Sequence, residues 1–555
     1  MSELVLGPLL RYVGEHDATV WVETDSDCEV EICGHSSRTF EVSGHHYALV
    51  RIDGLEPGTV TEYEVYLDGE CAWPPRHSPY PASVIRTSDR NRPYRIIFGS
   101  CRVARPHQPP YTLARDADPR AKEVDALYTY ALRMTTRPQE EWPDLLLWLG
   151  DQVYADDVSI GTERFIASRR DLDEPPGPEV ANFEEYTRLY LDSWSDPLIR
   201  WILSTVSSAM IFDDHDVHDD WNASQAWVEK MRATSWWQDR IVGGFMSHWL
   251  YQHLGNLSPD ELDEDPVYCR LVAGEDAEPL VRDLAERADR DVGAMRWSFH
   301  RDLGPARLVV MDSRAGRVLE EDNRRMVDER EWDYIETHAD GDFDHVLLAT
   351  SVPFLLAPGM HHLEQWNERV AGGAWGVLAA RVGESIRQAL DLEHWAAFDR
   401  SFRELVELQR SVAAGERGGP PATVITLSGD VHHAYVYEVA FRRDADGSAD
   451  EARSRAAVYQ AVCSPMRNAL GKSERRAIKF AQSKPFAAVA RAVARAAGAR
   501  DQDIRWRQIG DGPWFNNQLA TLELDGRHAS VRLERPNPGQ AGPPQLQQLA
   551  ERRLA

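Results

Sequence analysis

The sequence predicts an α/β protein with an all-β domain at its N-terminus, and three observations lead to this prediction. After about residue 90, short and almost fully apolar runs end abruptly in polar residues, as strands buried on both faces of a sheet require. Long stretches of helical character separate these runs, which is typical of α/β folds. Before residue 90, apolar and polar residues alternate between turn residues, which indicates β-strands.

Length and composition agree with this class. The chain has 555 residues, of which 43% are apolar and 27% charged, so we expect roughly three or four structural units with ample material for a core. These values exclude a collagen-like, low-complexity or mostly disordered chain.

Residues 1–90 predict a β-sandwich that resembles fibronectin-type domains. Alternation marks strands at 19–24, 29–32 and 61–67. A Gly-Leu-Glu-Pro-Gly-Thr segment before the tyrosine-bearing strand looks like the corner of such a sandwich. We place a linker at 87–93.

The second part of the chain predicts buried strands, helical insertions and a closing hairpin. The buried strands are expected at 95–98, 145–149, 209–212, 307–311, 345–349 and 424–427. The insertions lie at about 160–300 and 361–415, where helical packing and partial cover of a site are both open. The basic, alanine-rich residues 475–500 could contact an anionic partner or form a solvated helical face. The hairpin joins 517–524 to 529–533, and residues 541–555 are expected to be a C-terminal tail.

The charge balance restricts the partners. Lys and Arg number 62 against 90 Asp and Glu, so the net charge is −28. Such a chain should repel nucleic acid and anionic membranes unless its cations are concentrated locally. A site for phosphorylated substrates would need an inverted field, for which bound metal is the obvious source.

Compartment signals are sparse. The first residues lack a basic segment and a twin arginine, and nowhere do about 18 apolar residues run uninterrupted, so we expect no membrane span. Six scattered cysteines do not make a disulfide scaffold. We therefore expect a reducing compartment, the cytoplasm.

Two of the buried runs lead into potential metal ligands. The first ends in a Gly-Ser-Cys turn that presents Cys101, although a lone cysteine is usually a small buried apolar residue. The second ends at Asp151, which could instead cap a helix, with Tyr154 three residues on. A carboxylate and a phenolate suit a hard trivalent ion, and a thiolate can join them.

Two further runs end in richer segments. Residues 213–220 hold five aspartates and two histidines, which favours metal binding or proton transfer over an acidic solvated loop. After residue 427, Asp430 and His432 follow at a spacing of two. In an extended segment both side chains would share one face, so that one ion or an ion pair could use both.

The four strand ends occur together in one order: Gly-Ser-Cys at 99–101, Gly-Asp-x-x-Tyr at 150–154, Asp-Asp-His-acid at 213–216 and Ser-Gly-Asp-x-His at 428–432. This conjunction resembles the alkaline phosphatase D (PhoD-like) family of the metallophosphoesterase superfamily. Residues 311–317 and 350–353 also look like its connecting motifs, and the resemblance covers about residues 1–535. It implies a metallophosphoesterase-like two-sheet β core flanked by helices over residues 91–540.

The resemblance also implies a centre of Fe³⁺ with Ca²⁺, with other divalent metals as an alternative. The iron ligands would be Cys101, Asp151, Tyr154 and His432, and Asp151 would bridge to a calcium ion bound by Asp214 and Asp430. His215 would protonate the leaving oxygen, and Arg314 and Arg317 would contact phosphate. The remaining polar neighbours are expected outside the direct ligand set: Asp213, Asp216, His218, Asp219 and His433.

The expected function is that of a metal-dependent phosphoesterase, in which a metal-activated hydroxide attacks a small-molecule phosphate monoester or diester. Nucleic acid is not expected as a stable partner. Secreted members of the family carry a twin-arginine signal, whereas this sequence begins without one. We therefore expect an intracellular enzyme. The alternative is a non-catalytic metal-containing binding or adhesion protein. No Gly-x-Ser-x-Gly elbow is present, and Gly-Lys-Ser at 471–473 lacks the earlier glycine of a P-loop. The oligomeric state stays open.

Overall fold

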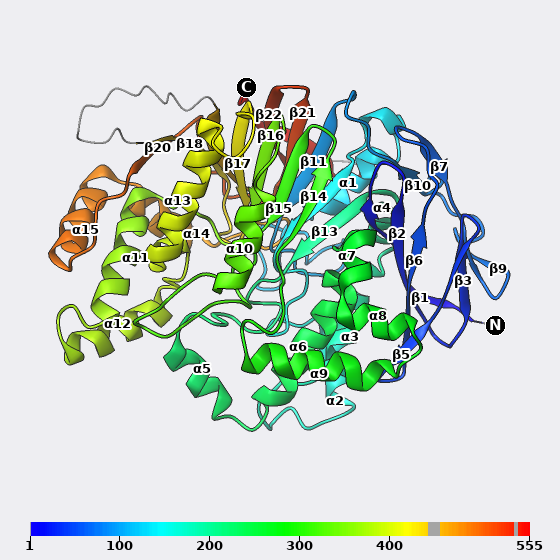
Figure 1. The fold of residues 1–555 in the computed structure, drawn as a ribbon. Coiled ribbons are helices and arrows are strands. Elements are labelled where there is room, and N and C mark those ends of the chain that lie inside the picture. The colour runs from blue at the N-terminus through cyan, green and yellow to red at the C-terminus, as the bar shows by residue number, and fades with distance from the viewer. Residues whose placement is uncertain (1, 442–455, 538–541) are drawn as a thin grey trace.

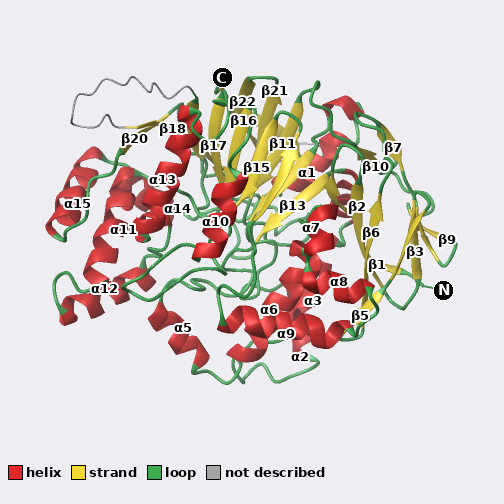
Figure 2. Ribbon diagram, in the orientation of Figure 1, coloured by secondary structure: helices red, strands yellow, loops and turns green. Residues whose placement is uncertain are grey.

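The computed structural model describes residues 2–441, 456–537 and 542–555. Two mixed β-sheets form the centre of the molecule, helices cover their outer faces, and a separate group of strands follows the N-terminus (Figures 1 and 2). The predicted class, a two-sheet β core flanked by helices with an N-terminal all-β domain, is confirmed.

The N-terminal domain contains two four-stranded sheets that share one apolar core. One sheet has the order β1 (Leu4–Val13), β2 (Ala18–Thr24), β6 (His45–Ile52) and β5 (Phe40–Val42). The other has the order β4 (His35–Arg38), β3 (Glu29–Ile32), β8 (Val65–Leu67) and β9 (Glu70–Trp73), and β7 (Val60–Glu62) pairs with β10 (Val84–Arg86).

The strand expected over 61–67 is divided. Its first part, β7, pairs with β10, and its second part, β8, pairs with β3. Tyr63 lies at the division and donates its hydroxyl to the Ser204 carbonyl, at 2.6 Å, in a helix of the following domain. This tyrosine therefore ties the sandwich to its neighbour, and the fibronectin likeness stays a prediction.

The first central sheet has six strands in the order β13 (Ser207–Ile211), β12 (Leu145–Leu149), β11 (Tyr94–Gly99), β21 (Leu519–Asp525), β22 (His528–Asn537) and β23 (Gln545–Arg553). The predicted hairpin is β21 with β22. The expected tail is wrong in its larger part, because β23 pairs antiparallel with β22 as the edge strand. Residue 541 lies outside the described residues.

The second central sheet has seven strands in the order β14 (Phe299–Leu303), β15 (Ala306–Val310), β16 (His345–Ala349), β17 (Thr423–Ser428), β19 (Ala457–Val462), β18 (Tyr435–Phe441) and β20 (Ile504–Gln508). The runs predicted as strands all form strands of the two central sheets, with β13 at an edge and the others inside, and β15, β16, β17 and β19 are parallel.

One apolar cluster fills the space between the sheets, with side chains from β11 and β12 on one side and from β15, β16 and β17 on the other. Alternate residues of the same strands face outward into two further clusters under the helices. Burial on both faces explains why these strands read as continuous apolar runs.

The expected insertions are helical. The first holds α2 (Ile160–Ala167), α3 (Phe183–Trp194), α4 (Pro197–Thr205), α5 (Gln225–Arg232), α6 (Trp237–Ser247), α7 (Pro259–Glu264), α8 (Pro266–Val272) and α9 (Ala277–Arg290). The second holds α11 (Pro358–Ala371), α12 (Val377–Ala389) and α13 (Asp399–Ala414). The remaining helices are α1 (Ala126–Met134), α10 (Glu329–His338), α14 (Lys472–Ala481) and α15 (Lys484–Ala496). Among the described residues, no helix combines the length and apolar character needed to cross a bilayer.

The sandwich packs closely against the first insertion. Arg11 of β1 is fully buried and donates to the carbonyls of Tyr251 and Gln252 at 2.6 and 2.7 Å. Trp21 and Tyr47 join the apolar cluster of α3, α4 and α6. The two predicted domains thus share a core.

Candidate metal centre

The predicted site residues converge where strands of both sheets end. Cys101, Asp151 and Asp214 follow β11, β12 and β13 of one sheet, and Asp430 follows β17 of the other. The turns interlock: the Asp430 amide donates to the Ser100 hydroxyl at 2.8 Å, and a Cβ on Gly429 would lie 2.3 Å from the same oxygen. Only glycine fits this contact between the sheets.

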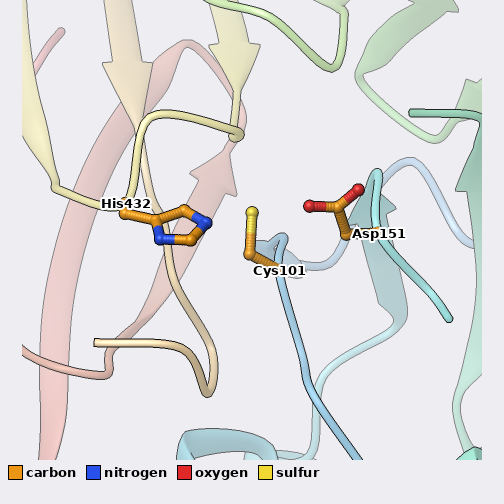
Figure 3. A group of neighbouring side chains, drawn as sticks. All are labelled: Cys101, Asp151 and His432. Carbon is orange, nitrogen blue, oxygen red and sulfur yellow. The ribbon is translucent and has the colours of Figure 1, made fainter. Parts of the chain in front are cut away.

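The first cluster contains Cys101, Asp151 and His432, whose ligand atoms all lie within 4.8 Å of one another. Figure 3 shows the His432 ring and the Asp151 carboxylate on opposite sides of the Cys101 thiol. Tyr154 donates its hydroxyl to the Asp151 carboxylate at 3.2 Å. The structure therefore brings together the four residues that sequence analysis assigned to iron.

The donor set fits a transition metal. Burial, followed by the nearby carboxylates Asp151 and Asp430, raises the pKa of the Cys101 thiol well above its usual value. Burial likewise raises the pKa of Asp151 and of Tyr154. Oδ1 of Asp151 is buried with no hydrogen-bond partner. Sulfur, oxygen and nitrogen donors thus meet in a buried site, and a bound cation would give the unpaired Asp151 oxygen a partner.

The second cluster contains three carboxylates, Asp213, Asp214 and Asp430, again within 4.8 Å of one another. Asp213 was expected outside the ligand set, yet it is fully buried and Oδ2 has no partner. Burial raises the pKa of Asp213, with the neighbouring carboxylates adding to the effect. An all-oxygen cluster suits a hard cation such as Ca²⁺.

A guanidinium already lies among these carboxylates. Arg314 is fully buried, and its side chain donates to Asp213 and to Glu393, each at 2.5 Å. Its Nη2 also lies 3.4 Å from Asp214 and 3.7 Å from Asp430. Arg314 therefore neutralises the second cluster and is not a free phosphate contact in this structure.

The expected geometry of Asp430 and His432 is wrong. Both residues adopt left-handed backbone conformations, with φ of 62° and 51°, instead of an extended segment. Asp430 consequently joins the carboxylate cluster while His432 joins the thiol cluster. Cys101 and Asp151 also have positive φ, 55° and 50°. Non-glycine residues in this region cost about 1–3 kcal/mol each and concentrate at functional sites.

His215 lies next to both clusters. It forms a third group with Asp151 and Asp214 within 4.8 Å. Its Nδ1 lies 2.9 Å from both oxygens of Asp156. Burial opposes the charged ring, but Asp156 and Asp214 hold the pKa of His215 well above its usual value.

Four residues of these groups line a cavity of about 430 Å³: Asp214, His215, Asp430 and His432. Its lining also includes the apolar side chains of Leu356, Met360 and Ile478. A larger hollow of about 580 Å³ near His107 contains none of the predicted site residues.

Family models match both parts of the chain. A protein-family model described as PhoD-like phosphatase matches residues 125–510, more than half of the chain. The chain belongs to the PhoD-like phosphatase family. A second family model, a domain of unknown function named DUF7800, matches residues 1–85.

One solved structure supports the fold of this PhoD-like chain. A structure titled "Structure of PhoD" aligns with a TM-score of 0.58 at 12% identity, over 99% of this chain and 92% of that one. Purple acid phosphatase PPD1 from yellow lupin (Lupinus luteus) seeds aligns with a TM-score of 0.45 at 10% identity, over 97% of this chain and 73% of that one. No curated protein sequence matched the chain.

Sequence analysis of this PhoD-like chain missed three residues of the site. His394 donates or accepts at both ring nitrogens, 2.6 Å from Glu364 and 3.1 Å from Asp430, and Glu393 binds Arg314. Burial alone would raise the pKa of Asp430, but the bond to His394 and the charge of Arg314 keep it below its usual value. All three belong to the second helical insertion, away from the strand ends that guided the prediction.

Proposed function

We propose that this chain hydrolyses phosphate esters with a mixed centre of Fe³⁺ and Ca²⁺. The observation that carries the proposal is the juxtaposition of a thiol-containing cluster and an all-carboxylate cluster, which reach one cavity through His432, Asp214 and Asp430. Cys101, Asp151, Tyr154 and His432 would hold iron, and the carboxylate cluster would hold the second ion. When bound, such metals lower the pKa of water and neutralise phosphoryl oxygens.

The protein side chains supply orientation and a proton. Asp156 fixes the tautomer and direction of His215, because both of its oxygens lie at hydrogen-bond distance from Nδ1. His215 also borders the cavity, so Nε2 is the position from which a proton can reach a leaving oxygen. His394 orients Asp430, because its Nε2 lies 3.1 Å from the Asp430 carboxylate.

The alternative is a non-catalytic metal-containing binding protein. A structural site normally fills its coordination with compact Cys and His ligands. Here most donors are oxygens, and two histidines with raised pKa border the same cavity, which favours catalysis.

We also propose the cytoplasm as the compartment. All six cysteines are free in the structure. Exposed and unpaired thiols such as Cys33 and Cys71 suit a reducing environment.

Elemental analysis with a visible spectrum tests the proposal. We expect about one iron per chain and a tyrosinate-to-iron absorption band, which Tyr154→Phe removes while iron stays bound. Turnover of p-nitrophenyl phosphate mono- and diesters should depend on the metal content. An absence of transition metal after reconstitution with iron and calcium, together with no turnover, would favour the binding-protein alternative.

A further inference from the structure

Exposed apolar side chains concentrate on one group of helices. Of the twelve large apolar residues that are exposed in the described chain, eight lie on α12, α14, α15 or the turns that flank α12. We call these eight residues the helical patch: Trp375, Val377, Leu378, Val382, Leu390, Phe480, Val489 and Val493. Leu378 is 79% exposed and Phe480 63% exposed, so neither is packed by this chain.

The helices of the patch are held together. The Trp375 indole donates to the Ala496 carbonyl at 3.4 Å, which joins the start of α12 to the end of α15. The rings of Phe480 and Phe486 lie 5.0 Å apart and join α14 to α15. Figure 1 shows α11, α12 and α15 at the end of the molecule opposite the N-terminal strands. Leu378 and Val382, like Val489 and Val493, are four residues apart, so each pair lies on one helical face.

The same helices carry an exceptional positive charge. Residues 471–500 contain eight Lys or Arg and one acidic residue, in a chain whose net charge is −28. Four cations of this segment form ion pairs with acidic side chains: Lys472, Arg475, Arg491 and Arg495. Arg381, Arg476 and Lys484 are exposed, and none has an acidic partner among the described residues. The unpaired charge on these helices is therefore positive, opposite in sign to the net charge of the whole chain.

The patch borders the candidate active site. Leu470, Ile478 and Ala481, in or just before α14, line the cavity, and Leu390 at the end of α12 lines it too. His215 and two residues of the carboxylate cluster, Asp214 and Asp430, line the same cavity. A surface that contacted α12 and α14 would thus lie beside the cavity.

We propose that α12, α14 and α15 dock this protein on an anionic lipid bilayer and so present phosphate esters with apolar chains to the cavity. Amphipathic basic helices with exposed Trp, Phe and Leu bury their apolar face at the headgroup boundary, and their cations bind anionic lipid. A nucleic acid would use the cations and leave the apolar residues exposed. The docking stands on these helices alone, and only its substrate part rests on the proposed phosphoesterase activity.

Vesicle co-sedimentation of the full chain tests the docking. The probes are vesicles of phosphatidylcholine with equal phosphatidylglycerol, and vesicles of phosphatidylcholine alone. We expect binding to the anionic vesicles that weakens at high salt. Reversing three cations should lower partitioning about 100-fold, and charging two apolar residues more than about 10-fold. The variants are Arg381→Glu/Arg476→Glu/Lys484→Glu and Leu378→Glu/Val489→Glu.

Matched controls use exposed residues elsewhere. Arg76→Glu/Arg164→Glu/Lys230→Glu changes the net charge equally, and Val272→Glu changes an equally exposed apolar residue. We expect these controls to lower partitioning by less than about 5-fold, because the charge effect falls off within a Debye length. Equal losses in controls and patch variants, or no binding to anionic vesicles at low salt, would overturn the docking. The docking would also be overturned if the protein did not bind lipid but formed a dimer, and if Leu378→Glu/Val489→Glu dissociated that dimer.

The readout separates this inference from the proposed function. Vesicle binding without hydrolysis of any ester would support the docking and reject the phosphoesterase activity. Hydrolysis of bis(p-nitrophenyl) phosphate without vesicle binding would support the activity and reject the docking. With both in place, the patch variants should lose turnover of phosphatidylglycerol in vesicles and retain turnover of the soluble diester.

Discussion

Replacing His215 by asparagine tests the assignment of the proton donor. The asparagine amide can keep a hydrogen bond to Asp156 but has no group that carries a proton at the position of Nε2. The ring is held at 2.9 Å by both oxygens of Asp156, so the loss concerns one atom in a fixed place. Removing a positioned general acid costs about 10²–10⁴-fold in kcat, which is about 3–5 kcal/mol of barrier.

The assay compares leaving groups. p-Nitrophenolate leaves without a proton, whereas an alkyl alcohol must be protonated as its bond to phosphorus breaks. His215→Asn should therefore slow alkyl esters by the full factor and p-nitrophenyl esters by less than about 10-fold. Metal content, measured on the same preparation, should equal that of the wild type.

The neighbouring His218 provides the control. Its Nδ1 lies 2.8 Å from the Asp219 carbonyl and it is absent from the cavity lining. His218→Asn should leave the dependence on the leaving group unchanged. An equal loss for activated and unactivated esters in His215→Asn, or a loss of metal, would refute the role of His215 as the acid.

Two further predictions concern stability. Arg314→Met leaves buried carboxylates without their cation, so the free energy of unfolding, measured by urea titration in EDTA, should fall by about 3–5 kcal/mol. Added Ca²⁺ should recover part of this loss. The same loss with and without Ca²⁺ would contradict a cation site there. His253 is fully buried, and burial lowers its pKa in the folded protein to about 3. In the unfolded chain its pKa is about 6.5, so between these two values the unfolded chain binds a proton that the folded protein does not. The free energy of unfolding therefore falls as the pH drops from about 6.5 toward 3. His253→Phe should therefore reduce the difference in unfolding free energy between pH 7 and pH 5 by about 2 kcal/mol, and an unchanged difference would contradict this account.

The strands of the core could be predicted because the signal for burial on both faces is local. Every residue of 145–149 is apolar, and every residue of β12 is buried. The edge strand β23 gave no such signal, because most of its side chains are exposed and its sequence is rich in Gln and Arg. β23 is a strand because it pairs with β22, and this pairing depends on tertiary structure that the local sequence does not encode. The division of 61–67 into two strands likewise depends on which strands they pair with, β10 for β7 and β3 for β8.

The convergence of the candidate ligands at strand ends could be predicted for a related reason. Parallel strands bring their carboxyl ends to one edge, so a motif at each end predicts a common site. The roles of Arg314, Glu393 and His394 could not be predicted, because they depend on how an insertion folds back over that edge. Spacing alone also misplaced Asp430 and His432, since the left-handed turn separates side chains that an extended segment would align.

The left-handed backbone of four candidate ligands means that selection for stability and selection for activity favour different residues at the same positions. At Cys101, Asp151, Asp430 and His432, a glycine would relieve the strain of positive φ, and a folded chain without ligands would be the result. A library screened for heat resistance alone should therefore drift toward glycine at these positions. The same library screened for turnover should hold all four. Backbone strain at these four positions therefore indicates that their side chains are retained for activity and not for stability.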